Sequence, residues 1–343
     1  MMQAGTANVA EPVPTRVLIV GAGPAGYTAA IYAARASLSP VLVTGMQPGG
    51  QLTITTEVEN FPGFATAIQG PWLMEQMSEQ ARHVGARIIE DNVITLDLSS
   101  RPFRATCDSG TVFLADTLVI ATGARARWLG LESERDFAGY GVSACATCDG
   151  FFFRNKAVAV IGGGNSAVEE ALYLTNHASQ VTLVHRRDRL KAEKILQDRL
   201  IANPKVRILW NCVPEEILGP VDPVRRVTGL RLRDLKADAS FIEPVDGVFV
   251  AIGHDPASTL VRDQLELDAA GYIHIGSWST RTSVDGVFAA GDVADPKFRQ
   301  AVTASGMGCM AALEAEKFLA EHSPVAAVRL EALQSQGMTA AWD

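Results

Sequence analysis

Arg16-Val-Leu-Ile-Val20 runs directly into Gly21-Ala-Gly-Pro-Ala-Gly26, and an amphipathic stretch of small residues then continues to Ala36. An apolar run, a glycine turn and a helical stretch in this order are typical of the phosphate-binding end of a nucleotide-binding unit. A second apolar run, Val41-Leu-Val43, follows the helical stretch. The segment therefore predicts a strand, a glycine turn, a helix and a second strand.

The same plan occurs a second time. Ala157-Val-Ala-Val-Ile161 leads into Gly162-Gly-Gly-Asn-Ser-Ala167, and Val181-Thr-Leu-Val184 comes after another helical stretch. In both copies the residue just after the second strand, Thr44 or His185, lies 23 positions beyond the first glycine. An ordinary glycine turn does not explain this repeated context. The sequence therefore predicts an α/β protein with two Rossmann-like, three-layer nucleotide-binding domains.

Each copy closes with an apolar strand that ends in small residues, Leu118-Val-Ile-Ala-Thr-Gly123 in the first and Val248-Phe-Val-Ala-Ile-Gly253 in the second. A separate hairpin over Phe103 to Leu114 is expected before the first of these strands. The later segment from Thr282 to Asp292 has no counterpart in the second copy, so we assign it to the first. The second domain is therefore expected as an insertion in the first. The expected boundaries are residues 1–123 with 254–343 for the first domain and 124–253 for the second.

Composition and charge exclude several classes of protein. The 343 residues are 48% hydrophobic, and 30 basic and 38 acidic residues give a formal net charge of −8. This balance, without a long basic run, argues against binding to nucleic acid or to an anionic membrane surface. Val17 to Ala34 is a stretch of 18 residues without charge, but its glycines, its proline and its short length argue against a membrane span or a targeting signal.

Cys145-Ala-Thr-Cys148-Asp149 lies just upstream of the second nucleotide-binding strand. The five cysteines contain only this one close pair, which is not the pattern of a secreted disulfide framework, so we expect a cytoplasmic protein. A C-x-x-C pair can be a redox dithiol, half of a zinc site, or inert packing. No second C-x-x-C or H-x₃-H motif completes a metal site, so we expect no metal and favour the redox dithiol. Asp149 is a candidate acid and base for thiol exchange, or alternatively a helix N-cap.

The two copies differ at the position where dinucleotide sites distinguish their ligands. The second copy continues as His185-Arg-Arg-Asp-Arg189, with Lys191 close behind, and arginines at this position accommodate a 2′-phosphate. This pattern favours NADPH over NADH, and the alternative is a solvated basic helix start. The first copy ends in Thr44-Gly45 and runs into a neutral loop from Met46 to Leu52. Together with Asp292, whose carboxylate could accept from a polyol hydroxyl, this loop suggests FAD.

This combination of motifs resembles the low-molecular-weight, bacterial-type thioredoxin reductases, from about Arg16 to Leu319. Related flavoproteins share pieces of the set but rarely all of it. The segments that carry the resemblance are Gly21-Ala-Gly-Pro-Ala-Gly-Tyr-Thr-Ala-Ala30, Gly49-Gly-Gln-Leu52, Thr56-Glu-Val-Glu-Asn60, Ala121-Thr-Gly123, Cys145-Ala-Thr-Cys-Asp-Gly150, Gly162-Gly-Gly-Asn165, His185-Arg-Arg-Asp188, Gly291-Asp292 and Arg299-Gln-Ala301.

The resemblance implies a homodimeric flavoprotein that passes hydride from NADPH to FAD, then electrons to the Cys145–Cys148 disulfide, and then reduces thioredoxin. In the family the second cysteine, here Cys148, lies nearest the flavin and is the favoured attacker, with Cys145 resolving and Asp149 as acid and base. Lys191 stands where the family often has arginine. The expected FAD ligands are Gly21, Gly23, Pro24, Ala25, Gly26, Thr44, Gly45, Gly49, Gly50, Gln51, Leu52, Asn60, Ala121, Thr122, Gly123, Gly291, Asp292, Arg299, Gln300 and Ala301. The expected NADPH ligands are Gly162, Gly164, Asn165, Ser166, His185, Arg186, Arg187 and Lys191.

Several other functions stay open at this point. A flavin-dependent dithiol oxidase would keep FAD and the cysteine pair but would not need the arginines that follow His185. A ferredoxin-fed reductase would dispense with a complete second glycine loop. A peroxiredoxin-reducing flavoprotein would usually add a long N-terminal disulfide module, and only 15 residues precede Arg16. A redox-sensing protein would bind NADPH without turning it over.

Overall fold

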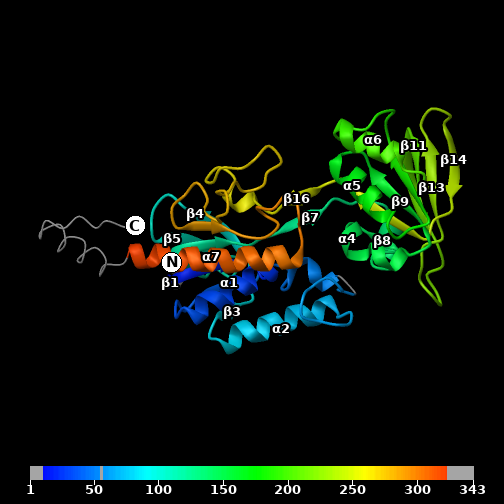
Figure 1. Ribbon diagram of the computed structural model, residues 1–343. Helices are drawn as coiled ribbons and strands as arrows, with labels where there is room; N and C mark the ends of the chain where they lie inside the picture. The colour runs from blue at the N-terminus through cyan, green and yellow to red at the C-terminus, as the bar shows by residue number, and fades with distance from the viewer. Residues whose placement is uncertain (1–10, 55–56, 323–343) are drawn as a thin grey trace, which may run out of the picture. The chain divides into compact units, whose positions relative to one another are not determined.

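The computed structural model describes residues 11–54 and 57–322, and the chain divides into two compact units (Figure 1). The first unit consists of the chain up to Glu57, Phe61–Ala124 and the chain from Pro256 onward. The second unit is Arg125–Asp255 together with Val58–Asn60. Along the chain the second unit is thus inserted between two parts of the first. Residues 1–10 and 323–343, which we expected in the first domain, lie outside the described residues.

The first unit is built on one sheet with the strand order β3-β2-β1-β6-β5-β4, and β17 also pairs with β6. The strands β1, β2, β3, β6 and β17 are parallel, whereas β4 and β5 form an antiparallel extension. The elements are β1 (Val13–Val20), α1 (Pro24–Arg35), β2 (Val41–Val43), η1 (Gly50–Ile54), α2 (Gly70–His83), β3 (Arg87–Ile89), β4 (Val93–Asp97), β5 (Phe103–Cys107), β6 (Val112–Ile120), η3 (Thr259–Val261), β17 (Val287–Ala289) and α7 (Ala301–Glu321).

Apolar side chains cover both faces of this sheet. On one face α1, α2 and α7 bury a core with alternate residues of the strands, such as Ile19 and Val119. The other face packs against segments near η3, including Val261. Gly308 of α7 lets the two helices approach closely, because a Cβ there would lie 2.1 Å from the Ala25 carbonyl oxygen of α1. This contact holds α7 against the helix that follows the first glycine loop.

Strand β6 differs from the sequence prediction. We expected a hairpin strand ending near Leu114 and a separate strand from Leu118, but β6 runs unbroken through both. Strand β1 pairs with β6 on both sides of Asp116, through Thr15 with Ala115 and Val17 with Thr117, and the Thr117 hydroxyl donates to the Arg16 carbonyl oxygen at 2.9 Å. The polar Asp116 is exposed between buried neighbours. Pairing with a strand distant in sequence therefore keeps β6 continuous across Asp116, although this polar residue interrupts the local apolar pattern.

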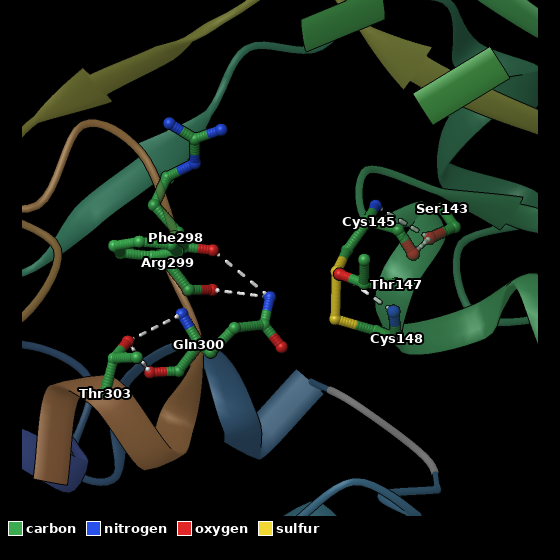
Figure 2. The surroundings of a disulfide bond; sticks show 8 residues. All are labelled: Ser143, Cys145, Thr147, Cys148, Phe298, Arg299, Gln300 and Thr303. Atoms are coloured by element: carbon green, nitrogen blue, oxygen red, sulfur yellow. Dashed lines mark hydrogen bonds between the residues drawn. A yellow bond between two sulfur atoms is a disulfide. The ribbon is translucent and has the colours of Figure 1, made fainter. Parts of the chain in front are cut away.

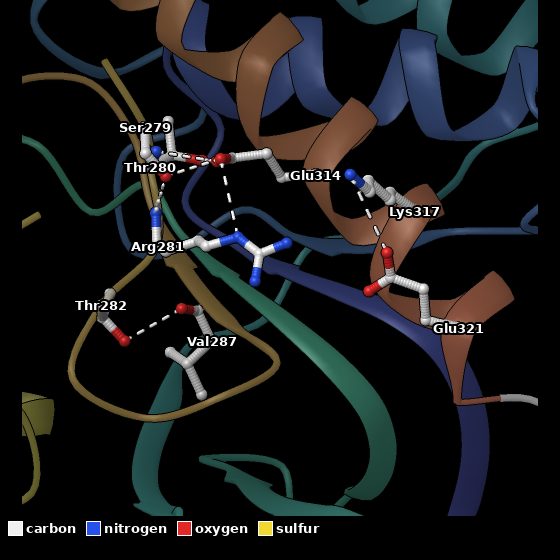
Figure 3. A network of polar contacts seen from close by, with 8 residues as sticks. All are labelled: Ser279, Thr280, Arg281, Thr282, Val287, Glu314, Lys317 and Glu321. Carbon is white, nitrogen blue, oxygen red and sulfur yellow. Dashed lines mark hydrogen bonds and ion pairs between the residues drawn. The ribbon is translucent and has the colours of Figure 1, made fainter. Parts of the chain in front are cut away.

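A carboxylate on α7 holds the loop that leads to β17. Glu314 accepts hydrogen bonds from the Ser279 hydroxyl at 2.6 Å and from the Thr280 N–H at 2.7 Å (Figure 3). The Thr280 hydroxyl also donates to Glu314, and Arg281 Nε lies 3.8 Å from its carboxylate. The Ala289 N–H in turn donates to the carbonyl oxygen of Thr280 at 2.8 Å. The network thus fixes β17, and with it the predicted site residues that follow this strand.

The second unit has three layers. A parallel sheet of order β11-β10-β9-β15-β8 packs helices on one face and the antiparallel sheet β12-β13-β14 on the other. The elements are α3 (Glu132–Asp136), β8 (Val142–Ser143), α4 (Ala146–Asp149), η2 (Gly150–Phe153), β9 (Ala157–Gly162), α5 (Asn165–Leu174), β10 (Gln180–His185), α6 (Lys194–Ala202), β11 (Val206–Trp210), β12 (Cys212–Leu218), β13 (Gly229–Asp234), β14 (Ala239–Glu243) and β15 (Gly247–Ala251). The predicted α/β class with two parallel, Rossmann-like sheets is confirmed.

The two chain crossings between the units pair with each other. Strand β7 (Ala124–Ala126) and strand β16 (His254–Pro256) form a two-stranded ribbon. Beside it, the Ala257 N–H donates to the Gly123 carbonyl oxygen and the Arg127 N–H donates to the Gly253 carbonyl oxygen, both at 2.9 Å. Hydrogen bonds of this kind keep the two crossings side by side.

Candidate active site

The first glycine loop joins β1 to α1 and leaves the amino end of α1 open. A Cβ on Gly21, whose φ is +108°, would lie 2.3 Å from the Ala121 carbonyl oxygen, so this close approach requires glycine. A Cβ on Gly23 would meet no atom of the described residues within 4 Å. Gly23 is also the N-cap of α1 and has no side chain to satisfy the free N–H groups there. These N–H groups and the helix dipole suit a phosphate.

Other segments predicted for this site lie against the same loop. The Gly49 N–H donates to the Ala22 carbonyl oxygen at 3.0 Å. A Cβ on Gly291 would lie 2.9 Å from the Ala25 Cβ, so the chain after β17 passes directly over the start of α1. Strands β1, β2 and β6 are parallel, so the residues that follow them share one edge of the sheet. The remaining predicted residues on these segments are Pro24, Gly26, Thr44, Gly45, Gly50, Gln51, Leu52, Thr122 and Gly123.

A buried carboxylate shapes the turn that leads into α7. Asp295 accepts hydrogen bonds from three successive backbone N–H groups, at 2.8 to 3.0 Å, the last of them from Arg299. Arg299 has a φ of +49°. The next residue, Gln300, is the N-cap of α7, and its N–H donates to Thr303 Oγ1 at 3.3 Å (Figure 2). Arg299, Gln300 and Ala301 are therefore held together at the amino end of α7.

Asp292 is half-buried just beyond the end of β17. Burial and the charge of Asp295 raise the pKa of the Asp292 carboxyl to about 6, and Arg299 partly opposes this rise. A carboxylate removed from water in this way is suited to accept hydrogen bonds from the hydroxyl groups of a ligand. The open glycine loop, the uncapped helix and this carboxylate together fit the pyrophosphate and polyol chain of FAD.

The raised pKa predicts how the stability of flavin-free protein depends on pH. The folded state binds the Asp292 proton more tightly than the unfolded chain does, so this carboxyl contributes stability at low pH that is lost as pH rises through about 6. In urea unfolding, Asp292→Asn should abolish a loss of at most about 3 kcal/mol between about pH 4 and pH 7. Asp285→Asn changes an exposed carboxyl on the same segment and should follow the wild-type curve. Parallel curves for Asp292→Asn and wild type would refute the raised pKa.

The second glycine loop joins β9 to α5 and repeats the features of the first. A Cβ on Gly162 would lie 2.4 Å from the Ala251 carbonyl oxygen, the counterpart of the contact between β1 and β6. Gly164 is the N-cap of α5 without a capping side chain, and a Cβ there would meet no described atom within 4 Å. Asn165 and Ser166 are the first residues of the helix. This loop therefore offers a second pyrophosphate site.

The segment Arg186–Lys191, which we call the arginine arm, follows β10 directly. Its four cationic side chains, Arg186, Arg187, Arg189 and Lys191, are exposed. None of them forms an ion pair with another residue of the described chain. The Lys191 N–H donates to the Gly163 carbonyl oxygen at 2.7 Å, so the arm lies beside the second glycine loop. Unpaired cations at this position fit a 2′-phosphate.

Cys145 and Cys148 form a disulfide with an S–S distance of 2.05 Å (Figure 2). Cys145 is the N-cap of α4, and its sulfur accepts a hydrogen bond from the Cys148 N–H at 3.2 Å. The Thr147 hydroxyl lies 3.3 Å from the same sulfur. Donors directed at a sulfur stabilise its thiolate form, so this turn favours negative charge on Cys145 once the disulfide opens.

Asp149, the last residue of α4, is half-buried. Burial raises the pKa of its carboxyl, and a hydrogen bond with Ser143 partly opposes this rise. Asp149 occupies the N-cap position of η2, as the alternative reading expected, but its side chain makes no capping hydrogen bond there, and Cys145 is the N-cap of α4. Ser143 is 7% exposed and also accepts the Cys145 N–H at 3.0 Å (Figure 2). One hydroxyl therefore connects the disulfide turn to the carboxyl.

Comparisons with known proteins agree with this site. The profile of the family described as pyridine nucleotide-disulphide oxidoreductase matches residues 15–308. The thioredoxin reductase of Rickettsia felis is 59% identical over 307 residues, covering 90% of this chain and 99% of the relative. The chain belongs to the thioredoxin reductase family. The thioredoxin reductase of Vibrio cholerae is 56% identical over 312 residues, covering 89% of this chain and 96% of the relative. The solved thioredoxin reductase of Giardia duodenalis superposes with a TM-score of 0.86 at 43% identity, covering 90% of this chain and 99% of that one.

Membership of the thioredoxin reductase family confirms the resemblance drawn from the motifs and makes the Cys145–Cys148 pair the redox-active disulfide of a flavin oxidoreductase. Among residues 11–54 and 57–322, no helix has the length and apolar character needed to cross a membrane. The same residues contain no cluster of three or more His, Cys, Asp or Glu that could hold a metal ion. Asn60 is exposed and is grouped with the second unit, so its expected contact with FAD stays a prediction.

Two residues that shape the site of this thioredoxin reductase family member, Ser143 and Asp295, were not predicted from the sequence. Asp295 was visible in principle, because Asp295-Pro296 is a turn signal and the carboxylate bonds the N–H groups of residues two to four positions ahead. Ser143 gave no such signal. The role of Ser143 depends on its hydrogen bond with the Asp149 carboxyl. The two residues are brought together only by the turn of α4.

Proposed function

We propose that this protein is an NADPH-dependent thioredoxin-disulfide reductase that binds FAD on its first unit. The observation that carries the proposal is the Cys145–Cys148 disulfide in the same unit as the second glycine loop and the arginine arm. Relatives named thioredoxin reductase, from Rickettsia felis and Escherichia coli, are 59% and 55% identical to the chain. The proposal includes a homodimer, which the sequence resemblance implies, and a cytoplasmic location, which the cysteine pattern favours.

The two glycine loops divide the nucleotides between the units. The first loop, with Asp292 and the amino end of α7, would hold FAD, and the second loop, with the arginine arm, would hold NADPH. When bound, FAD would supply the two-electron chemistry that links the NADPH hydride to the disulfide. The chain itself contributes binding, orientation and proton transfer. Asp292 is suited to bind a hydroxyl group of the polyol, and the uncapped helices α1 and α5 are suited to bind pyrophosphate oxygens.

The disulfide turn organises the exchange chemistry. When the S–S bond opens at Cys148, Cys145 leaves as a thiolate that the Cys148 N–H and the Thr147 hydroxyl stabilise. Cys148 then attacks one sulfur of the thioredoxin disulfide and forms a mixed disulfide. Cys145 attacks the Cys148 sulfur and expels reduced thioredoxin. Asp149, kept protonated to higher pH by burial, supplies a proton to a departing thiolate and later recovers one from solvent. One hydride and one proton are consumed for each thioredoxin dithiol formed.

The spectrum and the NADPH consumption of purified protein test this function. We expect a yellow protein that oxidises NADPH rapidly only when oxidised thioredoxin is present. NADPH-independent oxygen consumption with a dithiol substrate would instead identify a dithiol oxidase. NADPH binding without turnover in an anaerobic titration would identify a redox-sensing protein. A preparation that stays colourless after incubation with FAD would contradict the proposal.

The arginine arm predicts a preference for NADPH. Arg186→Gln combined with Arg187→Gln should raise the KM for NADPH about 100-fold or more, because each guanidinium loses a charge-assisted hydrogen bond to the 2′-phosphate. The KM for NADH should change less than about threefold, since NADH has no such phosphate. Lys194→Gln removes an exposed cation from the start of α6 and should leave both constants unchanged. Equal effects on the two nucleotides would contradict the 2′-phosphate assignment.

A further inference from the structure

His185 was predicted as an NADPH ligand, but its ring is buried and contacts backbone atoms of the protein. The side chain is 7% exposed and ends β10, just before the arginine arm. Its Nδ1 lies 2.9 Å from the Gly162 carbonyl oxygen, and its Nε2 lies 2.9 Å from the Arg189 carbonyl oxygen. One partner is the first residue of the glycine loop and the other lies in the middle of the arm. The ring thus spans the two segments that would hold NADPH.

The ring is also enclosed by packing. A Cβ on Gly163 would lie 2.2 Å from ring atoms of His185, so the loop fits over the imidazole only because residue 163 is glycine. The indole of Trp210 meets the ring edge to face, with centroids 6.2 Å apart. A backbone carbonyl oxygen only accepts hydrogen bonds, so a neutral imidazole makes one of its two contacts and a protonated one makes both. Either form connects the ring to a backbone segment of the site.

The rest of the arm is anchored on the same side. Leu190 in the arm and Ala192 just after it are each 6% exposed and belong to the core of the second unit, so the backbone of the arm is held while its cations stay in solvent. The Glu193 N–H donates to Asn165 Oδ1 at 2.8 Å, which ties the chain just beyond the arm to the first turn of α5. Without such contacts, the mutual repulsion of four exposed cations would spread the segment.

We propose that His185 is a positioning residue that sets the specificity for NADPH, because it holds the arginine arm at a fixed distance from the second glycine loop. This inference rests on the proposed use of NADPH. The 2′-phosphate and the pyrophosphate belong to one adenosine moiety, so their separation is set by the ligand. An arm already held at that separation binds the 2′-phosphate without first losing conformational freedom. The imidazole itself touches neither phosphate and acts through Arg186 and Arg187.

The test uses the full-length, FAD-loaded protein and two mononucleotides that differ in the 2′-phosphate. Calorimetric titration would compare 2′,5′-ADP with 5′-AMP for wild type, His185→Ala and His185→Gln. We expect the Kd for 2′,5′-ADP to rise about tenfold in His185→Ala, and less in His185→Gln, which keeps one donor. The Kd for 5′-AMP should change less than about twofold in both, because the glycine loop keeps its own turn.

Steady-state kinetics give a readout that a loss of folding would not reproduce. The KM for NADPH should rise in the order wild type, His185→Gln, His185→Ala, while kcat at saturating NADPH and the KM for NADH stay within about twofold. Lys194→Ala, which removes an 80% exposed cation beside the arm, should behave as wild type. Unfolding midpoints and flavin content show whether a variant is misfolded. If His185→Ala does not fold, the comparison of His185→Gln with wild type still tests the inference.

Two outcomes would overturn the inference. Equal weakening of 2′,5′-ADP and 5′-AMP would show that His185 supports the whole site rather than its specificity, and unchanged binding of both would show that the arm holds its place without the ring. A wild-type protein that binds the two mononucleotides equally would overturn the NADPH assignment as well. The wild-type titration therefore tests the proposed cofactor, and the comparison of variants tests the role of His185.

Discussion

Cys148→Ser is expected to lower kcat/KM for thioredoxin by at least about 1000-fold while NADPH still reduces the bound flavin at the wild-type rate. A serine hydroxyl cannot form a disulfide, so electrons that reach the flavin have no route to thioredoxin. Stopped-flow absorbance of the flavin measures the first half of the reaction, and thioredoxin-dependent NADPH oxidation measures the second. Loss of both halves would contradict the assigned order of electron transfer.

Two companion variants separate the roles of the cysteines. Cys309→Ser alters a cysteine of the first unit outside the pair and should retain wild-type activity. Cys145→Ser should be as inactive as Cys148→Ser in turnover but should still attack thioredoxin. With a single-cysteine thioredoxin activated as its thionitrobenzoate disulfide, Cys145→Ser should form a stable mixed disulfide and Cys148→Ser should not. The reverse pattern would make Cys145 the attacking residue.

Asp149→Asn is expected to lower kcat for thioredoxin reduction by about 100- to 10,000-fold, the range for loss of a positioned acid or base. Burial raises the pKa of the Asp149 carboxyl, so its protonated form persists to higher pH than that of an exposed carboxyl. The wild-type rate should therefore fall as pH rises through this pKa. Asp149→Asn should lack this fall, because an amide does not titrate. A profile with the same fall in the variant would remove Asp149 from proton transfer.

Stability and binding serve as controls for Asp149→Asn. The folded state favours the protonated carboxyl, so this group contributes stability at low pH that is lost as pH rises through its pKa. An amide does not ionise, so the variant does not lose this stability as pH rises. At pH 8 it should unfold at the wild-type temperature or above it. The KM for NADPH should not change. Asp238→Asn, at an exposed carboxyl on the turn between β13 and β14, should match wild type in every measurement.

The nucleotide-binding framework was predictable because its signals are local. The tight turns at Gly21 and Gly162 need a residue without Cβ, and the strands and helices around them show their own periodicity. Strand β6 was predicted as two pieces, and the exposed Asp116 lies between them. Pairing with β1, which is distant in sequence, keeps the strand continuous across this residue. The register of a sheet is set by its neighbouring strands, and a local window does not contain them.

The candidate site was predictable in its residue types but less so in their roles. The spacing of Cys145 and Cys148 indicated a redox pair, and the arginines after β10 indicated a 2′-phosphate. The environment of Asp149 was not accessible in this way, since its raised pKa comes from burial and its opposing hydrogen bond comes from Ser143. His185 was grouped with the NADPH ligands by its position beside the arginines. In the structure both of its ring nitrogens face backbone carbonyl oxygens.

By itself, the amino-acid sequence determined which chemical groups are present and at what spacing: two glycine loops, a C-x-x-C pair and a run of cations. These features depend on backbone sterics and on neighbours a few residues apart, which the order of residues specifies directly. Only the tertiary structure decided which carboxyls are desolvated, which imidazole nitrogens are engaged and which strand is continuous. Those properties arise where segments distant along the chain exclude water from one another, and they exist only once the chain has folded.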